Sequence, residues 1–310
     1  MLKKIVFMGT PLFAVSILKT LYQNGYEIPV VYTQPPQKSQ RGQKVNKSPI
    51  QGISETLSIE LRTPLSLKNN SEEYQYLKKL NADIAIVVAY GQIIPKEMLS
   101  LTKKGFINIH ASLLPKWRGA APIQRSIMNL DKQTGISFMK INEKLDSGPI
   151  CNSYKIDIIK NDNAEIISNK LSSLASEKII DNIDKFIEDN ISFQEQNHKN
   201  ATYAKKIEKS EGQINWTSDA EKIIGKINGL CPNPGAWFLH KGERYKVLKA
   251  EISYTKGEKP GMVLDDSLEV SCKDKSIKIL EIQRQGKRPQ KINEFILGSK
   301  IKKGSVLIYV

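Results

Sequence analysis

The sequence predicts an α/β protein with a parallel-rich sheet, followed by a small second domain built mainly from β-strands. Two features indicate the α/β class: the chain opens as strand, glycine turn and helix, and Ala82 to Ala89 is almost wholly apolar, as a strand covered on both faces requires. Short apolar runs separated by turns indicate the β domain. A chain of 310 residues can form two domains. We expect a first domain at 1–189, a linker at 190–210 and a second domain at 211–310.

Composition excludes several classes of protein. Hydrophobic residues make up 40% of the chain and its mean hydropathy is −0.37, which is typical of a soluble globular protein. No apolar run reaches the roughly 18 residues of a membrane span, and the first apolar run is too short for a signal peptide. We therefore expect a cytoplasmic protein with no membrane partner. Its three cysteines lie far apart without metal-type spacing, so we expect them to pack in cores and expect no metal.

The net charge of +15 suggests a polyanionic partner. The excess of Lys and Arg over Asp and Glu is about twice as dense in residues 201–310 as in residues 1–200. A chain that is rich in Lys, Ile and Asn throughout could carry the same charge without any selected function. Charge alone leaves the two interpretations open.

The first element is a buried strand at residues 2–9, which ends at Gly9-Thr10-Pro11. We expect a helix to follow, with Thr10 at its N-cap and Pro11 in its first turn. A strand that opens through a glycine turn into a helix is how a Rossmann-like unit begins. The turn matches neither the GxGxxG pattern nor a P-loop, so we expect no dinucleotide or NTP site here.

A long basic stretch follows the second strand, which we place at Glu27 to Thr33. Residues 34–49 have no apolar periodicity and no acidic residue, so we expect a mobile loop rather than a regular element. Its four cations are Lys38, Arg41, Lys44 and Lys47. Such a loop is often simply solvated, and the composition of the stretch does not decide between solvation and binding.

Helices and strands alternate through the rest of the first domain. We expect helices at residues 50–57, 71–80, 120–129 and 162–189, and strands at residues 59–63, 82–89, 105–110, 135–141 and 151–158. Tyr90-Gly91 follows strand 82–89, and a glycine at a strand end lets a ligand approach the backbone. A plain strand-to-helix loop would have the same sequence.

The second domain begins with a predicted helix at residues 218–228. Five short strands follow at residues 236–239, 245–252, 261–264, 268–272 and 276–283. That number of strands is typical of a small Greek-key barrel of OB type, a fold that often binds nucleic acid.

The stretch GFINIHASLLPKWRGAAP, Gly105 to Pro122, is the strongest candidate for a functional site. Asn108 and His110 are two residues apart in a strand, so their side chains point to one face at its carboxyl end. Ligands bind at such ends in open α/β sheets. Read alone, His110 could equally be a hydrogen-bonded structural histidine.

Asp146 adds a third polar group at a strand end, because it follows strand 135–141 and precedes a Gly-Pro turn. An amide, an imidazole and a carboxylate together suit the attack of an amine on a carbonyl-like carbon. The amide can donate to a developing oxyanion, the imidazole can donate or shuttle a proton, and the carboxylate can orient the ring or accept the proton of the amine. We therefore predict Asn108, His110 and Asp146 as catalytic residues.

Several motifs resemble the methionyl-tRNA formyltransferase family. They are INIHASLLPKWRGAAPIQRSI with LDSGPI downstream, FMGTPLFA near the start, NADIAIVVAYGQIIP in the middle, and KIEKSEGQINW, PGAWF, KVLKAE and ILEIQRQGK in the last third. The resemblance covers nearly the whole chain. One departure is Cys231-Pro232-Asn233-Pro234, which lacks the aromatic residue that usually stands between the prolines.

The resemblance implies a Rossmann-like formyltransferase domain followed by an OB-like, tRNA-binding domain. It implies transfer of a formyl group from 10-formyltetrahydrofolate to the methionine of initiator tRNA, by a monomer without a metal. It places folate against the turn after strand 82–89 and the loop after His110, at Tyr90, Gly91, Ser112, Leu113, Leu114 and Pro115. It places the acceptor end of the tRNA against the basic loop, at Lys38, Arg41, Lys44 and Lys47.

Two other functions compete with this interpretation. A related formyltransferase could act on a small amine, such as glycinamide ribonucleotide or an amino sugar, but it would not need a basic second domain. A non-catalytic RNA-binding protein could keep the fold, but it would not need Asn108, His110 and Asp146 together.

Overall fold

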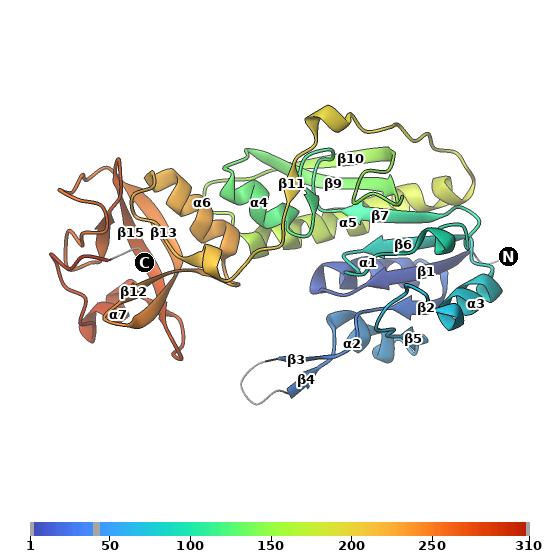
Figure 1. Ribbon diagram of the computed structural model, residues 1–310, viewed down its shortest axis with the longest axis horizontal. Coiled ribbons are helices and arrows are strands. Elements are labelled where there is room, and N and C mark those ends of the chain that lie inside the picture. The colour runs from blue at the N-terminus through green and yellow to red at the C-terminus, as the bar shows by residue number, and fades with distance from the viewer. Residues whose placement is uncertain (1–2, 40–43, 308–310) are drawn as a thin grey trace. The chain divides into compact units, whose positions relative to one another are not determined.

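The computed structural model describes residues 3–39 and 44–307, and of residues 37–39 and 44–45 it describes the backbone (Figure 1). The chain forms two compact units. The N-terminal unit comprises Met1–Ala120, Thr134–Ile156 and Ser168–Ala204, and the C-terminal unit comprises Ala121–Gln133, Asp157–Ile167 and Lys205–Val310.

A seven-stranded, mostly parallel sheet organises the N-terminal unit, in the order β10-β9-β7-β6-β1-β2-β5 (Figure 1). The strands are β1 (Lys4–Gly9), β2 (Glu27–Tyr32), β5 (Leu61–Arg62), β6 (Ile84–Val88), β7 (Phe106–His110), β9 (Gln133–Lys140) and β10 (Ile150–Asp157). Strand β1 pairs in parallel with β2 on one side and β6 on the other, and β6 pairs in parallel with β7. All five residues of β6 are buried, as its apolar sequence predicts. The predicted α/β class is confirmed.

Helices connect these strands. They are α1 (Leu12–Gln23), α2 (Pro49–Thr56), α3 (Ser71–Leu80), the 3-10 turns η1 (Lys96–Met98) and η2 (His198–Asn200), and α5 (Ala164–Ile187), most of which lies in this unit. Helix α3 has the predicted bounds, and Asn70 caps it by accepting a hydrogen bond from the Glu73 amide. The buried Glu73 carboxylate accepts hydrogen bonds from the Tyr32 hydroxyl and the Arg62 guanidinium, which offset the cost of its burial.

The predicted cap of the first helix is wrong. Helix α1 begins at Leu12, and its N-cap is Pro11, whose side chain makes no cap hydrogen bond. The Thr10 hydroxyl instead donates to the Tyr90 carbonyl oxygen at 2.7 Å and accepts from the Gln34 amide at 3.3 Å. Thr10 thus links the carboxyl ends of β1 and β6, where the connections leave the sheet in opposite directions.

The basic stretch after β2 contains a short hairpin, so the expectation of a loop without regular structure is wrong. Strands β3 (Gln37–Ser39) and β4 (Lys44–Asn46) pair antiparallel, with Lys38 opposite Val45. Paired residues of a hairpin form hydrogen bonds between their backbone groups. A ladder this short can form in that way without an apolar periodicity in its sequence.

The C-terminal unit contains an antiparallel, curled sheet, as the sequence predicts (Figure 1). Its strands are β12 (Ala236–His240), β13 (Glu243–Ser253), β14 (Glu269–Ser271), β15 (Ser276–Arg284) and β16 (Gln290–Lys291). Single bridges add residues 262–263 to the sheet, so the predicted strand 261–264 is reduced to isolated pairs. The remaining elements are α4 (Pro122–Met128), η3 (Ser210–Gly212), α6 (Ala220–Leu230) and α7 (Ile292–Leu297).

An aromatic cluster fills the core of the C-terminal unit. Phe238 stacks on Tyr245 with ring centroids 5.5 Å apart, Trp216 lies 5.9 Å from Phe238, and Phe295 meets Tyr245 edge to face. Large aromatic side chains bury much apolar area, which stabilises a small sheet domain.

Much of the predicted linker 190–210 has defined structure. Gln194 forms a backbone bridge to Ile150, and β11 (Tyr203–Ala204) pairs in parallel with β8 (Arg118–Gly119). The domain boundaries at 189 and 211 stay a prediction.

None of the helices in residues 3–39 and 44–307 combines the length and apolar character that a membrane crossing requires. The three cysteines are free, with Cys231 and Cys272 buried and Cys151 half-buried. Burial raises the pKa of the Cys151 thiol to about 11 and of the Cys272 thiol to about 12, so both stay protonated and unreactive at neutral pH.

We predict that Gly229→Ala destabilises the C-terminal unit. A Cβ at Gly229 of α6 would lie 2.6 Å from the Met128 side chain and 2.9 Å from the Gln124 carbonyl oxygen of α4. We expect the free energy of unfolding to fall by about 1–3 kcal/mol, measured by urea titration with Trp fluorescence. The control Gly52→Ala on α2 has no atom within 4 Å of the added Cβ and lies in the N-terminal unit, so it should not lower the free energy of unfolding of the C-terminal unit. A Gly229→Ala protein as stable as the wild type would contradict close packing of α4 on α6.

Candidate active site

The carboxyl end of β7 carries two polar side chains, Asn108 and His110. This strand pairs in parallel with β6 and antiparallel with β9, with His110 opposite Ser137. The His110 side chain is 6% exposed, and Asn108 is half-buried between apolar neighbours in the strand. The alternation of the strand places both on one side, as the sequence predicts.

Asp146 reaches these two side chains from the loop after β9. Its Oδ1 accepts from the Asn108 amide Nδ2 at 3.4 Å, and its Oδ2 lies 3.7 Å from His110 Nδ1. Oδ2 also accepts from the Gly119 backbone N–H at 2.8 Å. The structure therefore brings together the three residues predicted to be catalytic, with the Asp146 side chain 15% exposed.

One hydrogen bond fixes the tautomer of His110. Its Nε2 lies 2.9 Å from the Trp117 carbonyl oxygen, which can only accept, so Nε2 must carry a proton. In the neutral ring Nδ1 then has the lone pair, and it faces Asp146. His110 can accept a proton at Nδ1 and become an imidazolium beside a carboxylate, or donate that proton to a developing oxyanion.

The short strand β8 and the residue before it hold the site together. Trp117 supplies the carbonyl that orients His110, and Gly119 supplies the amide that binds Asp146. Gly119 has φ 119°, and a Cβ there would lie 2.8 Å from the Ala204 carbonyl oxygen of β11. Only glycine allows β8 and β11 to approach this closely.

Sequence analysis assigned no role to Gly119 or to Gln196, although both contact the Asp146 loop. Gln196 is buried and its side-chain amide donates to the Asp146 and Gly148 carbonyl oxygens. It lies in a segment without periodicity, so no local pattern marks it. The role of Gly119, in the tripeptide Trp117-Arg118-Gly119, becomes visible only when its positive φ is known.

The loop predicted to bind folate, Ser112 to Pro115, is mostly built into the protein. The Ser112 hydroxyl is buried and donates to the Lys116 carbonyl oxygen at 2.6 Å. The Ser137 hydroxyl donates to the Ser112 carbonyl oxygen and accepts from the Leu114 amide. Leu113 and Pro115 are half-buried and present the accessible surface of this loop.

The turn Tyr90-Gly91 presents backbone rather than side chains. The Tyr90 side chain is 2% exposed in the core, where burial and the charge of Glu73 raise the pKa of its phenol, so the ring stays neutral and apolar. Gly91 is exposed with φ 85°, beside the Gln34 side chain. A ligand at this turn would meet the Gly91 backbone.

The cations predicted to bind tRNA are only partly described. Lys38 and Lys44 lie on the paired strands β3 and β4, and Arg41 lies outside the described residues. The exposed Lys47 ammonium forms an ion pair with Glu55 at 2.9 Å, which partly neutralises it. Among the residues that the structure describes, no group of three His, Cys, Asp or Glu side chains could hold a metal ion.

Two protein-family models match this chain. The model described as formyl transferase matches residues 3–183, and the model described as formyl transferase, C-terminal domain, matches residues 206–300.

Relatives similar over their full length include two enzymes named methionyl-tRNA formyltransferase. The protein from Pelagibacter ubique is 68% identical over 306 residues, which cover 98% of each chain. The protein from Caldanaerobacter subterraneus is 41% identical over 307 residues, which cover 98% of this chain and 99% of the relative.

The fold is also similar to that of solved structures. The N-formyltransferase from Helicobacter canadensis, solved with folinic acid and dTDP-3-aminofucose, superposes with a TM-score of 0.70 over 92% of this chain and 100% of the other, at 18% identity. At that identity the likeness concerns the fold alone.

We predict that the neutral His110 ring carries its proton on Nε2. The side-chain ¹⁵N chemical shifts of labelled protein, recorded well above the ordinary histidine pKa of about 6.5, should show an unprotonated Nδ1. The chain has three histidines, so His110→Asn assigns the signals by their loss. A neutral ring protonated on Nδ1 would contradict the hydrogen bond to Trp117.

Proposed function

The chain belongs to the methionyl-tRNA formyltransferase family, and from this we propose that it transfers the formyl group of 10-formyltetrahydrofolate to the amino group of methionine on initiator tRNA. The observation that carries the proposal is the contact of the Asp146 carboxylate with Asn108, His110 and Gly119 at the end of β7.

The reaction joins the amine nitrogen to the formyl carbon and breaks the bond from that carbon to the folate nitrogen. An α-amine has a pKa near 8, so much of it is already neutral near pH 7 to 8 and needs positioning and removal of a proton. The Asn108 amide and protonated His110 would donate to the oxyanion. Asp146 would accept the proton of the amine, directly or through water, and help to return a proton to the folate nitrogen.

The residues at the strand ends suit a folate, which is a flat polar ring on a longer chain. The exposed backbone at Gly91 can face the ring, and Leu113 with Pro115 offers apolar surface. The buried Tyr90 and Ser112 side chains are held by the protein, so we propose that these two residues, like Leu114, contribute through backbone atoms. The folate supplies the formyl group, and the protein supplies its orientation.

A formyltransferase for a small amine is the competing function, since the N-formyltransferase from Helicobacter canadensis, which has a similar fold, was solved with dTDP-3-aminofucose. The chain is 68% identical to an enzyme named methionyl-tRNA formyltransferase and 18% identical to that neighbour, which favours tRNA over a small amine as the acceptor. One assay decides between them: incubation with 10-formyltetrahydrofolate and either methionylated initiator tRNA or small amines. Formylation of a small amine without formylation of tRNA would overturn the proposal.

We propose the cytoplasm as the site of action and a monomer as the acting form. Three free cysteines, two of them buried, suit a reducing compartment. All groups of the proposed reaction come from one chain.

We predict that Asn108→Ala and Asp146→Ala each lower turnover by about 10²–10³-fold, because each removes a group that acts on the transition state. Folate affinity, measured by calorimetry, should change little, since neither side chain is placed against the ring. Asp266→Ala, at an exposed carboxylate in the C-terminal unit, is the control for a changed charge. Near wild-type turnover of Asp146→Ala would refute its role in proton transfer.

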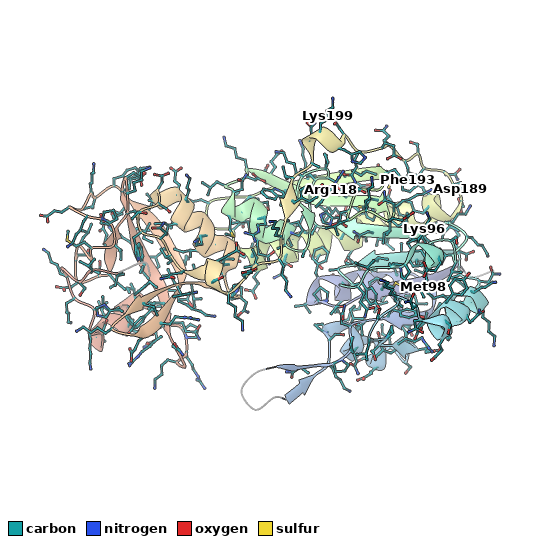
Figure 2. The ribbon with its side chains drawn as sticks, in the orientation of Figure 1. Lys96, Met98, Arg118, Asp189, Phe193 and Lys199 are labelled. Carbon is teal, nitrogen blue, oxygen red and sulfur yellow. The ribbon has the colours of Figure 1, made fainter. Side chains whose placement is uncertain are left out.

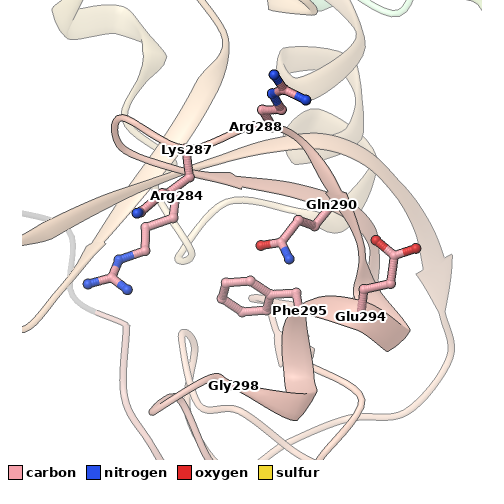
Figure 3. A pocket seen from close by; sticks show the side chains of 7 residues that line it. All are labelled: Arg284, Lys287, Arg288, Gln290, Glu294, Phe295 and Gly298. Atoms are coloured by element: carbon pink, nitrogen blue, oxygen red, sulfur yellow. The ribbon is translucent and has the colours of Figure 1, made fainter.

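A basic pocket on the C-terminal unit is a candidate contact for the tRNA backbone. Its volume is about 360 Å³, and its lining residues are Arg284, Lys287, Arg288, Gln290, Glu294, Phe295 and Gly298 (Figure 3). Arg284 is paired with Glu243, whereas Lys287 and Arg288 form no ion pair with the residues that the structure describes. Figure 3 shows Arg284 and Lys287 on the opposite side of Phe295 from Glu294. Unpaired cations attract phosphates most strongly, because no neighbouring carboxylate offsets their field.

We predict that Arg288→Ala and Arg41→Ala each weaken tRNA binding and lower the slope of log affinity against log salt by about one, because each would release one counterion fewer. The control Lys178→Ala removes the same charge where Asp181 and Glu177 already pair with it, so its slope should equal that of the wild type. Slopes and affinities unchanged in both test variants would remove these residues from the tRNA interface.

A further inference from the structure

The side chain of Gln196 makes two hydrogen bonds to the Asp146 loop. It is 6% exposed, and its Nε2 donates to the Asp146 carbonyl oxygen at 3.0 Å and to the Gly148 carbonyl oxygen at 2.7 Å. One of these carbonyls belongs to the residue that carries the carboxylate, and the other belongs to the residue two positions later. Both protons of the amide are therefore used on one turn of the backbone.

Arg118 binds the oxygen of the same side-chain amide. Its Nε and Nη2 donate to Gln196 Oε1 at 3.1 and 2.6 Å. A guanidinium has only donors, so the amide oxygen must face Arg118 and the amide nitrogen must face the loop. All four hydrogen-bonding positions of Gln196 are satisfied in this one orientation.

Arg118 is itself buried, with 4% exposure, and its Nη2 donates to Nδ1 of the surface residue His198 at 2.9 Å. Figure 2 labels Arg118 on β8 and Lys199 in the 3-10 turn beside His198. Within the described residues it has no carboxylate partner. A buried cation without a counter-ion is costly, and the two hydrogen bonds to Gln196 Oε1 offset part of that cost.

Asp146 needs external support because its backbone is left-handed, with φ 44°. A non-glycine residue in this region is strained by about 1–2 kcal/mol, and it stays there only when its surroundings hold it. The Gln196 bond to the Asp146 carbonyl oxygen acts on this residue directly. Release of the turn would move the carboxylate away from Asn108, His110 and the Gly119 amide.

We propose that Gln196, oriented by Arg118, is a positioning residue that keeps the Asp146 carboxylate in place for the transfer step. The expected effect on kcat rests on the proposed function. The expected effect on the position of the Asp146 turn does not depend on catalysis. The alternative is that Gln196 only fastens the segment 191–204 to the unit.

Gln196→Glu separates the two roles. One oxygen of the new carboxylate can still accept from Nε and Nη2 of Arg118 and gains an ion pair with it, so the segment stays fastened. The substitution removes both N–H donors of Nε2 and places a carboxylate oxygen next to the carbonyl oxygens of Asp146 and Gly148. The hydrogen bonds that hold the Asp146 turn are therefore lost. The control Gln194→Glu makes the same change at an exposed side chain of the same segment.

For Gln196→Glu we expect kcat to fall by about 10–100-fold, because misplacement of a catalytic group lowers the rate of the transfer step. KM for both substrates should change by less than about threefold, and the melting temperature should stay unchanged. In an Asp146→Asn background the same substitution should cost less than about threefold, because the group it positions is already gone. Gln194→Glu should match the wild type in each assay.

A second measurement does not use the reaction. The Gly119 amide proton, which bonds to the Asp146 carboxylate, should exchange with solvent at least about tenfold faster in Gln196→Glu than in the wild type or in Gln194→Glu. Equal exchange, or an equal loss of kcat in the wild-type and Asp146→Asn backgrounds, would overturn the inference. Failure of the wild type to formylate methionyl-tRNA would overturn the proposed function alone, since the exchange measurement would still decide the inference.

Discussion

The hydrogen bond from the Gly119 amide to the Asp146 carboxylate is the contact on which the geometry of the site depends. It joins the strand β8 to the loop after β9, two segments with little regular structure of their own. A carboxylate that is largely shielded from water needs such donors, and Asn108 adds another. Because Trp117, one peptide unit before Arg118, also fixes the ring of His110, one short stretch of chain sets the positions of the His110 ring and the Asp146 carboxylate.

The sheet explains where this contact forms. Strands β6 and β7 run in parallel, and their carboxyl ends present exposed backbone and polar side chains at one edge. One fold can host different functions, so the sheet does not by itself choose the acceptor. We propose that the choice comes from cationic residues outside the catalytic trio, such as those of the basic stretch 34–49 and the pocket lined by Lys287 and Arg288.

Two local predictions failed for the same reason: a tertiary partner outweighed a local preference. Threonine before a helix ordinarily caps it, but the Thr10 hydroxyl bonds to the Tyr90 carbonyl oxygen, eighty residues away. Polar residues without periodicity ordinarily form a loop, but residues 37–39 and 44–46 satisfy each other's backbone groups as a hairpin. In both cases a backbone group supplies the deciding partner: the Tyr90 carbonyl oxygen for the Thr10 hydroxyl, and the facing strand for the hairpin. Sequence patterns describe such backbone partners only indirectly.

The sequence by itself determined the parallel sheet, the separate β domain and the convergence of Asn108 with His110, because buried strands have a marked apolar pattern and a fixed alternation of side chains. It also suggested Asp146, since polar residues at strand ends in such sheets gather at one edge. The tertiary structure alone decided which nitrogen of His110 carries the proton, why residue 119 must be glycine, and that Gln196 and Arg118 support the Asp146 turn. These features depend on distances between residues as far apart in the chain as Gly119 and Ala204, and on single hydrogen bonds whose partners share no periodic pattern.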